Sequence, residues 1–587
     1  MAGGGEVVGQ YSQRVALVFI FNLIVGAGAL TIPAAFSKAG LYLGTVLVIF
    51  IAFLSYMCAT FVLEIMACSN ALILENNDVV VEGGATSPNG GEDKVAAVLA
   101  LIGEQESGTE MVPRADGAAT SETLRNRVGT IDVSTAADGE GGAGGTVVLT
   151  DTDDDALDAA GVESAPLMIS KRSKEPSEGG ARPSSVEGGR FDIRTKVEMT
   201  VMAEQFLGHR GVVLFYWCII AYLYGDLVIY AVAVPKSLRE MICARPAALP
   251  TDSAQPWPCL GSHDSDDVYR ACCWFFSATF APWVFFNVTQ TKLLQIITTV
   301  MRYMAFTIVI VLAVKGINEG EASPEPPVLA DFSALPTLFG VTIYSFMCHH
   351  SIPSLVMPIT VKRNLGSLFA KVFAFIVMLY LLVGYTATVR FGKDEIQDIY
   401  TLNFAKYKVR AVGFFLSVFP VLTMSSIFPI ISITLRENLK AMLHQQVSRA
   451  ITARGGGEYA QRMAVNVGFP LLTVVPPVAL SFFTQDVAML VGITGSYAGM
   501  AIQWLFPAWI VWRAREFHHL RDPSYPNEHK SIFQSQNWIF LIFIWSGLCF
   551  CFITWVHVME AMGTPISHHK HHTTRGHDHH HGGPTGD

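Results

Sequence analysis

Two apolar stretches of this chain are long enough to cross a lipid bilayer, yet residues that disfavour a continuous helix lie at the centre of each. The first, residues 15–36, contains FNLIVGAGALTIP and is interrupted by Asn22, Gly26, Gly28 and Pro33. The second, residues 338–361, contains YSFMCHHSIPSL and is interrupted by His349, His350, Ser351 and Pro353. Glycine costs about 1 kcal/mol in a helix interior and proline about 3 kcal/mol, so each stretch is predicted to form two half-helices. Backbone groups freed in lipid must bind protein groups, water, an ion or a solute, which makes the pair a candidate transport site.

The composition is that of an integral membrane protein. Hydrophobic residues make up 51% of the chain and charged residues 15%, and the mean hydropathy is +0.39. Roughly 20 apolar residues are needed to cross a bilayer. Eleven stretches meet this need: residues 15–36, 41–66, 211–235, 270–287, 293–316, 338–361, 366–391, 409–435, 463–483, 487–512 and 537–559. We therefore predict an all-α polytopic fold of eleven transmembrane helices. The formal net charge of −9 comes mostly from one acidic loop, so we expect no nucleic-acid partner.

Lysine and arginine in the short loops indicate the orientation in the membrane. They gather between spans eight and nine and between spans ten and eleven: Arg436, Lys440, Arg449, Arg454, Arg462, Arg513, Arg515, Arg521 and Lys530. This predicts a cytosolic N-terminus and an extracellular or lumenal C-terminus, although Arg390, Lys393, Lys406, Lys408 and Arg410 then lie on the outer side. Span six begins on the opposite side from span one. Spans one to five and six to ten are therefore predicted to be inverted repeats, with span eleven left over.

Four regions are predicted along the chain. They are residues 1–68 with the first two helices, an acidic cytosolic loop of residues 69–196, residues 197–561 with the other helices, and a histidine-rich tail of residues 562–587. We expect the loop and the tail to be disordered, and the loop is a candidate docking region for a cytosolic protein partner. Residues 195–207, which end the loop, predict an amphipathic helix at the membrane interface. Its apolar stripe consists of Met199, Met202, Ala203 and Phe206.

Histidine and cysteine do not predict a metal site or a cofactor in this chain. The tail histidines, among them His568, His569, His571 and His572, are irregularly spaced; such a tract can bind Zn²⁺ or Cu²⁺ weakly, and we interpret it as a solvated tail. Cys243 and Cys259 share one loop, and a disulfide between them is expected if that loop faces an oxidising lumen. Cys272 or Cys273 is an alternative partner for either cysteine, and the choice stays open.

Ionisable residues inside the spans are functional candidates, because a charge is costly in lipid. Asp226 lies in span three and Arg302 in span five. Helical rise separates them by about 9 Å in depth, so a direct ion pair is strained, and Glu64 in span two competes for the arginine. His349 and His350 lie beside the break of span six, and histidine titrates near physiological pH. Adjacent side chains cannot face the same point, so we expect one histidine to pack in the core and His350 to carry a proton.

Several stretches resemble the amino acid/auxin permease family and, within it, the transmembrane protein 104 family. They are the two interrupted segments together with YLYGDLVIYAVAVP (residues 222–235), TLNFA (401–405), SSIFPIISITLREN (425–438) and LVGITGSYAG (490–499). The resemblance covers nearly all of the membrane region in order, and it leaves out the long loop and the histidine tail. It implies an eleven-helix transporter with the inverted-repeat fold of amino-acid/cation symporters, in which helices one and six are broken.

The resemblance also implies which residues form the site. The substrate-binding set is Asn22, Gly26, Ala27, Gly28, Tyr224, Met347, His349 and His350, in which the amides of residues 26–28 hold a carboxylate. The alternative for Gly26 and Gly28 is close packing of two helices. The ion-coupling set is His350, Asp226, Thr423, Ser425 and Ser426, where the hydroxyls complete a sodium site with carbonyls of span one. The alternative for these hydroxyls is a hydrogen bond to their own helix.

The sequence therefore predicts a secondary active transporter of amino acids or similar small zwitterions, which works by alternating access and couples to H⁺ or Na⁺. The alternative is a transporter-like receptor that binds an amino acid and signals through its cytosolic loop. Enzymatic function has little support, because the sequence contains no P-loop, no nucleophile motif and no HExxH zinc motif.

Overall fold

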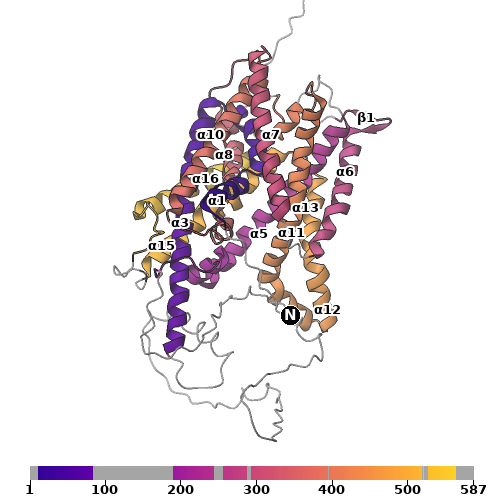
Figure 1. Cartoon of the computed structure of the whole chain (residues 1–587). Helices are drawn as coiled ribbons and strands as arrows, with labels where there is room; N and C mark the ends of the chain where they lie inside the picture. Colours follow the sequence, from indigo (N-terminus) through magenta and orange to yellow (C-terminus); the bar gives the residue numbers. More distant parts are fainter. Residues whose placement is uncertain are drawn as a thin grey trace, which may run out of the picture. The chain divides into compact units, whose positions relative to one another are not determined.

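The computed structural model describes residues 11–82, 189–243, 256–286, 292–393, 395–455, 457–517, 520 and 526–562. Contacts divide the chain into one unit of residues 1–73 and 181–587 and a second unit of residues 74–180. The contacts reported below belong to the first unit, which is mainly helical where it is described (Figure 1). The histidine tail and residues 83–188 of the predicted loop lie outside the described residues.

Apolar helices of membrane-spanning length dominate the described residues, and eight of them are long and apolar enough to cross a bilayer. Six are single helices: α3 (Leu41–Glu82), α5 (Met199–Ile242), α7 (Lys292–Asn318), α10 (Leu365–Phe391), α11 (Arg410–Ala453) and α16 (Gln536–Ala561). Two contain π-helical turns, one running from α12 (Glu458–Met463) into α13 (Phe469–Ser481) and one from α14 (Val487–Thr494) into α15 (Phe506–Glu516). The chain is therefore an all-α polytopic membrane protein, as predicted.

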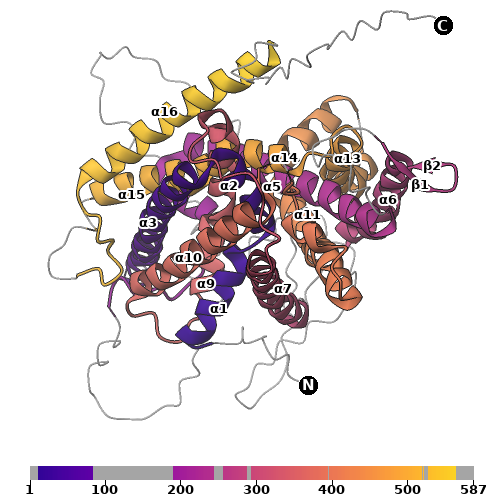
Figure 2. The same cartoon turned by 90° about the horizontal axis from the view of Figure 1, so that it is seen from above.

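Two predicted spans consist of shorter pieces. Span four is α6 (Ser265–Phe280) followed by a 3₁₀ turn over Ala281–Phe285, and span six is α8 (Leu335–Ser345), a 3₁₀ turn over His349–Ser351 and α9 (Ile352–Val356). Neither contains a continuous helix of 18 residues, so the count of eleven spans and the inverted repeat stay predictions. A hairpin of β1 (Pro258–Leu260) and β2 (His263–Asp264) precedes α6 at one edge of the bundle, and α16 lies along another edge (Figure 2).

The first span is broken between α1 (Gln13–Ile24) and α2 (Ala27–Ala39), which bend by 58° at residues 25–26. Gly26 precedes α2 with φ −105° and ψ −143°, which is not helical. Pro33 lies inside α2 and not at the break, which corrects the expectation that it interrupts the span. A proline removes one backbone hydrogen bond, and here α2 continues through it.

The two broken helices lie side by side. Just before α1 begins and just after α9 ends, the amide of Tyr11 donates to the Pro358 carbonyl at 3.0 Å, and the amide of Thr360 donates to the Tyr11 carbonyl at 3.1 Å. The Tyr11 hydroxyl donates to the Leu355 carbonyl, and burial raises its pKa to about 12, so it stays a donor at neutral pH. Near the breaks, Gly28 of α2 contacts Ser345 of α8 so closely that a Cβ on the glycine would lie 2.8 Å from the serine Cα.

The predicted loop is shorter than residues 69–196, because helix α3 continues through Glu82. Asn70 on this extension binds the other end of the loop. Its Oδ1 accepts hydrogen bonds from the amides of Arg194 and Thr195 at 3.0 and 2.8 Å, and from the Thr195 hydroxyl at 2.9 Å. Helix α3 thus extends past the predicted boundary at residue 68, and Asn70 holds Arg194 and Thr195 beside this extension.

The amphipathic helix forms as the sequence predicts, although it begins at Met199. The four stripe residues are buried, while Val201 on the opposite side is 42% exposed. Gly208 has a φ of +68°, which glycine adopts without strain, and it turns this arm away from the membrane part of α5. Phe206 of the stripe packs edge-on against Phe517, with 5.5 Å between the ring centroids.

The structure joins Cys243 at the end of α5 to Cys259 in β1 by a disulfide. The thiols of Cys272 and Cys273 in α6 are free and buried. Cys243 and Cys272 share a small apolar cluster with Trp257, over which the guanidinium of Arg239 lies at 4.8 Å. The disulfide therefore connects α5 to the hairpin that precedes α6.

Candidate functional site

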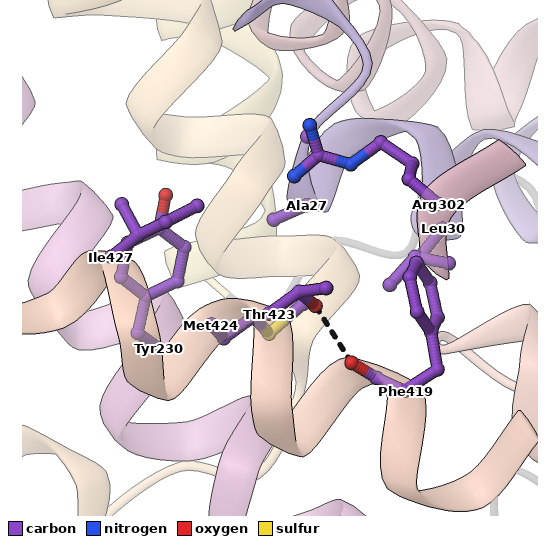
Figure 3. Close-up of a pocket in the computed structure, with 9 residues that line it drawn as sticks. Ala27, Leu30, Tyr230, Arg302, Phe419, Thr423, Met424 and Ile427 are labelled. Atoms are coloured by element: carbon purple, nitrogen blue, oxygen red, sulfur yellow. Dashed lines mark hydrogen bonds between the residues drawn. The ribbon is translucent and has the colours of Figure 1, made fainter. Parts of the chain in front are cut away.

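A small cavity lies at the break of the first span. Residues of α2, α5, α7 and α11 line it: Gly26, Ala27, Leu30, Tyr230, Arg302, Phe419, Thr423, Met424 and Ile427 (Figure 3). Its volume is about 10 Å³, which is roughly the room of one water molecule. The site is therefore closed in this conformation, and a larger ligand requires it to open.

The two glycines of the break have different surroundings. A Cβ added to Gly26 would meet nothing within 4 Å, and Gly26 lines the cavity, whereas Gly28 faces Ser345 and Tyr344 of α8. The amides of Ala27 and Gly28 have no acceptor among the described residues. Free amides at a helix N-terminus carry a partial positive charge and attract anions. Gly26 and Ala27 thus belong to the cavity, while Gly28 allows two helices to approach closely.

Arg302 of α7 binds the end of α1, on the side of the break opposite α2. Its side chain is buried, with 4% of the residue exposed, and its guanidinium donates to both the backbone carbonyl and the side-chain oxygen of Asn22. It forms no ion pair with any carboxylate among the described residues. Asp226 is not its partner, and Glu64 instead binds Arg515 with 2.7 and 2.9 Å between nitrogen and oxygen atoms. Arg302 is thus a buried cation beside the free amides of α2.

Asp226 of α5 binds tyrosine hydroxyls. It is 3% exposed, and its Oδ1 accepts a hydrogen bond of 2.7 Å from the hydroxyl of Tyr344 at the end of α8. The ring of Tyr222 lies 6.1 Å from that of Tyr344, and Tyr230, one helical turn after Asp226 in α5, lines the cavity. Within the described residues Asp226 has no cationic partner. Tyrosines thus surround this buried carboxyl group, and one of them also belongs to the cavity wall.

The two histidines of the second break face different helices. The Nε2 of His349 donates to the Ser55 carbonyl of α3 at 2.9 Å, and Gln503 hydrogen-bonds to the Ser55 hydroxyl. His350 lies on the side of Asp226, with its ring centroid 5.6 Å from that of Tyr222. The Nδ1 of His350 is buried and has no partner among the described residues. His349 therefore fixes the break to α3, and His350 adjoins the Asp226 cluster.

The hydroxyl groups proposed for a sodium site bond mainly to their own helix. Thr423 lines the cavity, but its hydroxyl donates to the Phe419 and Pro420 carbonyls at 2.8 and 3.3 Å (Figure 3). The Ser426 hydroxyl donates to the Thr423 carbonyl at 2.8 Å, and the Ser425 hydroxyl is buried without a partner among the described residues. No group of three metal-ligating side chains occurs in the part of the chain that the structure describes.

Comparison of the sequence with known protein families gives a match, which covers the helices that form the cavity. A family model described as transmembrane amino acid transporter protein matches residues 9–79 and 198–559. The chain belongs to the transmembrane amino acid transporter family. The matched residues omit most of the long loop and include both broken helices, the cavity and Asp226.

Relatives that this chain matches over most of their length occur in animals and in an amoeba. Human transmembrane protein 104 is 37% identical over 572 residues, which cover 94% of this chain and 98% of the relative. The transmembrane protein 104 homolog of Drosophila melanogaster is 32% identical over 580 residues, with coverage of 94% and 98%. That of Dictyostelium discoideum is 30% identical over 581 residues, with coverage of 94% and 99%. These matches confirm the resemblance that the sequence motifs indicated.

Of the residues predicted for the substrate and ion sites, only Gly26, Ala27 and Thr423 line the cavity. Tyr224 and Met347 are among those that lie elsewhere. The Tyr224 hydroxyl donates to the Leu472 carbonyl of α13 at 2.7 Å, and the Met347 side chain lies beside Gly499. Sequence reasoning missed the cavity residues Leu30, Tyr230, Phe419, Met424 and Ile427. One signal was present, because residues four apart share a helix face and Tyr222, Asp226 and Tyr230 follow this spacing.

Proposed function

We propose that this protein is a secondary active transporter of amino acids or similar small zwitterions. The observation that carries the proposal is a buried guanidinium, without a carboxylate partner among the described residues, beside free amides at a broken helix of an amino acid transporter family member. A buried cation is stable only when polar groups or an anion surround it. The α-carboxylate of an amino acid supplies that anion.

The carboxylate fits the break because two kinds of donor converge there. The amides of Ala27 and Gly28 begin α2, and Arg302 supplies a full positive charge on the opposite side. Hydrogen bonds to a charged group contribute about 1.5–3 kcal/mol each, more than neutral ones. The remaining wall is mostly apolar, with Leu30 and Met424, and suits the aliphatic part of a substrate.

Coupling to protons is favoured over coupling to sodium. Arg302 already donates to the Asn22 carbonyl, a span-one carbonyl of the kind that a sodium ion needs, and its positive charge opposes a second cation beside it. The Thr423 hydroxyl is turned to its own helix. Asp226, in contrast, is a buried carboxyl group without a cation among the described residues, and a carboxyl group in that position can bind and release a proton.

Alternating access follows from the two broken helices. We propose that spans one to five and six to ten are inverted repeats, that the N-terminus is cytosolic, and that the paired breaks rock against the other helices. The close contact of Gly28 with Ser345 and the backbone pairing of Tyr11 with residues 358–360 couple the two breaks. Because the cavity holds only about one water, the closed conformation must open on one side to admit a substrate.

The test is flux into liposomes that contain the purified protein, with a mixed amino-acid pool and with pH and sodium varied independently. We expect concentrative uptake that follows the pH gradient and does not need sodium. The double variant Ser425→Ala with Ser426→Ala changes no residue of the cavity wall and should transport like the wild type, whereas loss of a sodium response in it would establish the sodium site instead. Ligand binding without flux would favour the receptor alternative.

A further inference from the structure

A second hollow, separate from the cavity, lies where α5 leaves its amphipathic arm. It has a volume of about 650 Å³ and lies between residues 200–217 of α5 and residues 441–449 of α11. The beginning of the membrane part of α5 thus faces the end of α11, so the two helices run in opposite directions. Residue 211 begins the third predicted span and residue 435 ends the eighth, so the groove lies at the membrane surface on the side of the N-terminus.

The groove changes from apolar to polar along both helices. In α5 the polar residues Glu204 and His209 precede Val213 and Trp217, and in α11 Met442 precedes the polar residues up to Arg449. Because the membrane part of α5 and the end of α11 are antiparallel, Val213, Trp217 and Met442 lie at the membrane end, and Arg449 lies at the water end with His209 and Glu204. The exception is Val201, an apolar residue of the arm that also lines the groove. Trp217 is 57% exposed, as expected for an aromatic side chain at a membrane interface.

The polar end of the groove contains charges of both signs. Glu204 and Arg449 are exposed and form no ion pair with a described residue, and His209 lies between the arm and the membrane part of α5. A guanidinium binds phosphate well, and a carboxylate binds a primary amine. A lipid whose headgroup is anionic and has no amine would place a second negative charge next to Glu204. A zwitterionic headgroup offers a phosphate to Arg449 and a positive charge to Glu204.

We propose that this groove binds an aminophospholipid from the membrane leaflet on the side of the N-terminus. Its phosphate lies at Arg449 and His209, its amine at Glu204, and an acyl chain follows Val213, Trp217 and Met442. Phosphatidylethanolamine has this chemistry, and a volume of 650 Å³ holds its headgroup and the first part of a chain. The proposal does not depend on the transport function, because none of these residues lines the cavity.

Native mass spectrometry of the full chain tests the proposal, with phosphatidylethanolamine, phosphatidylcholine and phosphatidylglycerol of identical acyl chains. We expect the wild type to retain phosphatidylethanolamine several-fold better than the other two. Glu204→Gln should remove this preference, and Arg449→Ala and Trp217→Ala should weaken retention of all three lipids. Because these side chains are exposed, the variants should fold, and a thermal melt in detergent checks this.

The matched control is Arg462→Ala, which removes an exposed ion pair with Glu458 on α12 outside the groove. It should retain lipids like the wild type. Equal retention of phosphatidylglycerol and phosphatidylethanolamine by the wild type would overturn the choice of headgroup. Retention that is unchanged in all three groove variants would overturn the site itself.

Discussion

The two broken helices lie side by side, yet the charged residue that binds each one differs in sign. At the first break, the cation Arg302 binds the end of α1 and faces the cavity. At the second break, the carboxyl group of Asp226 binds Tyr344 at the end of α8, and His349 is fixed to α3. The first break therefore has a buried positive charge without a carboxylate partner among the described residues. The second break instead has a carboxyl group, which is able to exchange a proton.

The difference also appears in how each break satisfies its freed backbone groups. The Asn22 carbonyl of α1 receives the charged Arg302, while the Ser345 carbonyl of α8 receives the neutral hydroxyl of Tyr380 at 2.9 Å. The amides of Ala27 and Gly28 have no acceptor among the described residues. The amides of Cys348, His349 and His350 at the second break likewise have no acceptor among the described residues, so the two breaks differ in the charged group that each contacts and not in their free amides. The proposed function assigns substrate binding and proton binding to different breaks, and each assignment can be tested separately.

Replacing Arg302 should have the largest effect. Arg302→Met removes the positive charge that we propose for the substrate carboxylate; one hydrogen bond to a charged group is worth about 1.5–3 kcal/mol, so substrate affinity should fall about ten- to 100-fold. Arg302→Lys keeps the charge and should retain part of the affinity. Substrate-dependent thermal stabilisation in detergent measures the change, with Arg462→Ala as the control. Wild-type affinity in Arg302→Met would contradict the carboxylate site.

Asp226→Asn should separate coupling from binding. The amide has nearly the same shape and its oxygen still accepts the hydrogen bond from Tyr344, but it cannot exchange a proton. We expect substrate exchange between liposome lumen and medium to continue, and uptake driven by a pH gradient to disappear. Tyr344→Phe is the matched variant, because it removes one hydrogen bond and leaves the carboxyl group. Normal gradient-driven uptake in Asp226→Asn would transfer the proton role to His350, and His350→Ala should then abolish it.

The two histidines should differ in stability. His349→Ala removes the hydrogen bond from the buried imidazole to the Ser55 carbonyl, a net loss of about 0.5–1.5 kcal/mol, so the thermal midpoint should fall. His350 makes no such hydrogen bond among the described residues, and His350→Ala should lower the midpoint less. Denaturation followed by intrinsic fluorescence measures both variants. An equal loss in the two would show that His350 is also a structural residue.

The two glycines of the first break give a smaller and more local comparison. Gly28→Ala forces α2 away from Ser345, and overpacking of this kind costs about 1–3 kcal/mol. Gly26→Ala meets no atom within 4 Å, so the protein should fold normally while its substrate affinity falls. Folded yield and substrate-dependent stabilisation distinguish the two effects. Normal affinity in Gly26→Ala would place the ligand away from this backbone.

The long loop should matter least to either break. Replacing residues 83–188 by a short Gly/Ser linker should leave flux unchanged, since each doubling of loop length costs only about 0.6 kcal/mol. Asn70 and Thr195 keep the ends of the loop together in this variant. Transport by correctly inserted protein is the measurement. A loss of flux would show that the loop takes part in the transport cycle, and normal flux with altered trafficking or partner binding would support its role as a docking region.

The sequence by itself determined that the chain is an all-α polytopic membrane protein and that both stretches break. Helix propensity is local, so the glycines at residues 26 and 28 weaken a helix there before any tertiary contact forms, and the length of an apolar stretch shows whether it can span a bilayer. The stripe of Met199, Met202, Ala203 and Phe206 was likewise visible from helical spacing alone, because a single helix fixes which side chains share a face. Pro33 was misjudged because a proline in the interior need not end a helix.

Only the tertiary structure decided which charged groups meet the breaks. Arg302 binds Asn22 and not Asp226 or Glu64, and Asp226 binds Tyr344, because the helices that carry these residues pack together only in the folded chain. The same packing places Gly26 at the cavity and Gly28 against α8, and it directs the Tyr224 hydroxyl to α13 instead of the cavity. Depth along a helix follows from the sequence, but the direction of a side chain around the helix bundle depends on contacts between residues hundreds of positions apart.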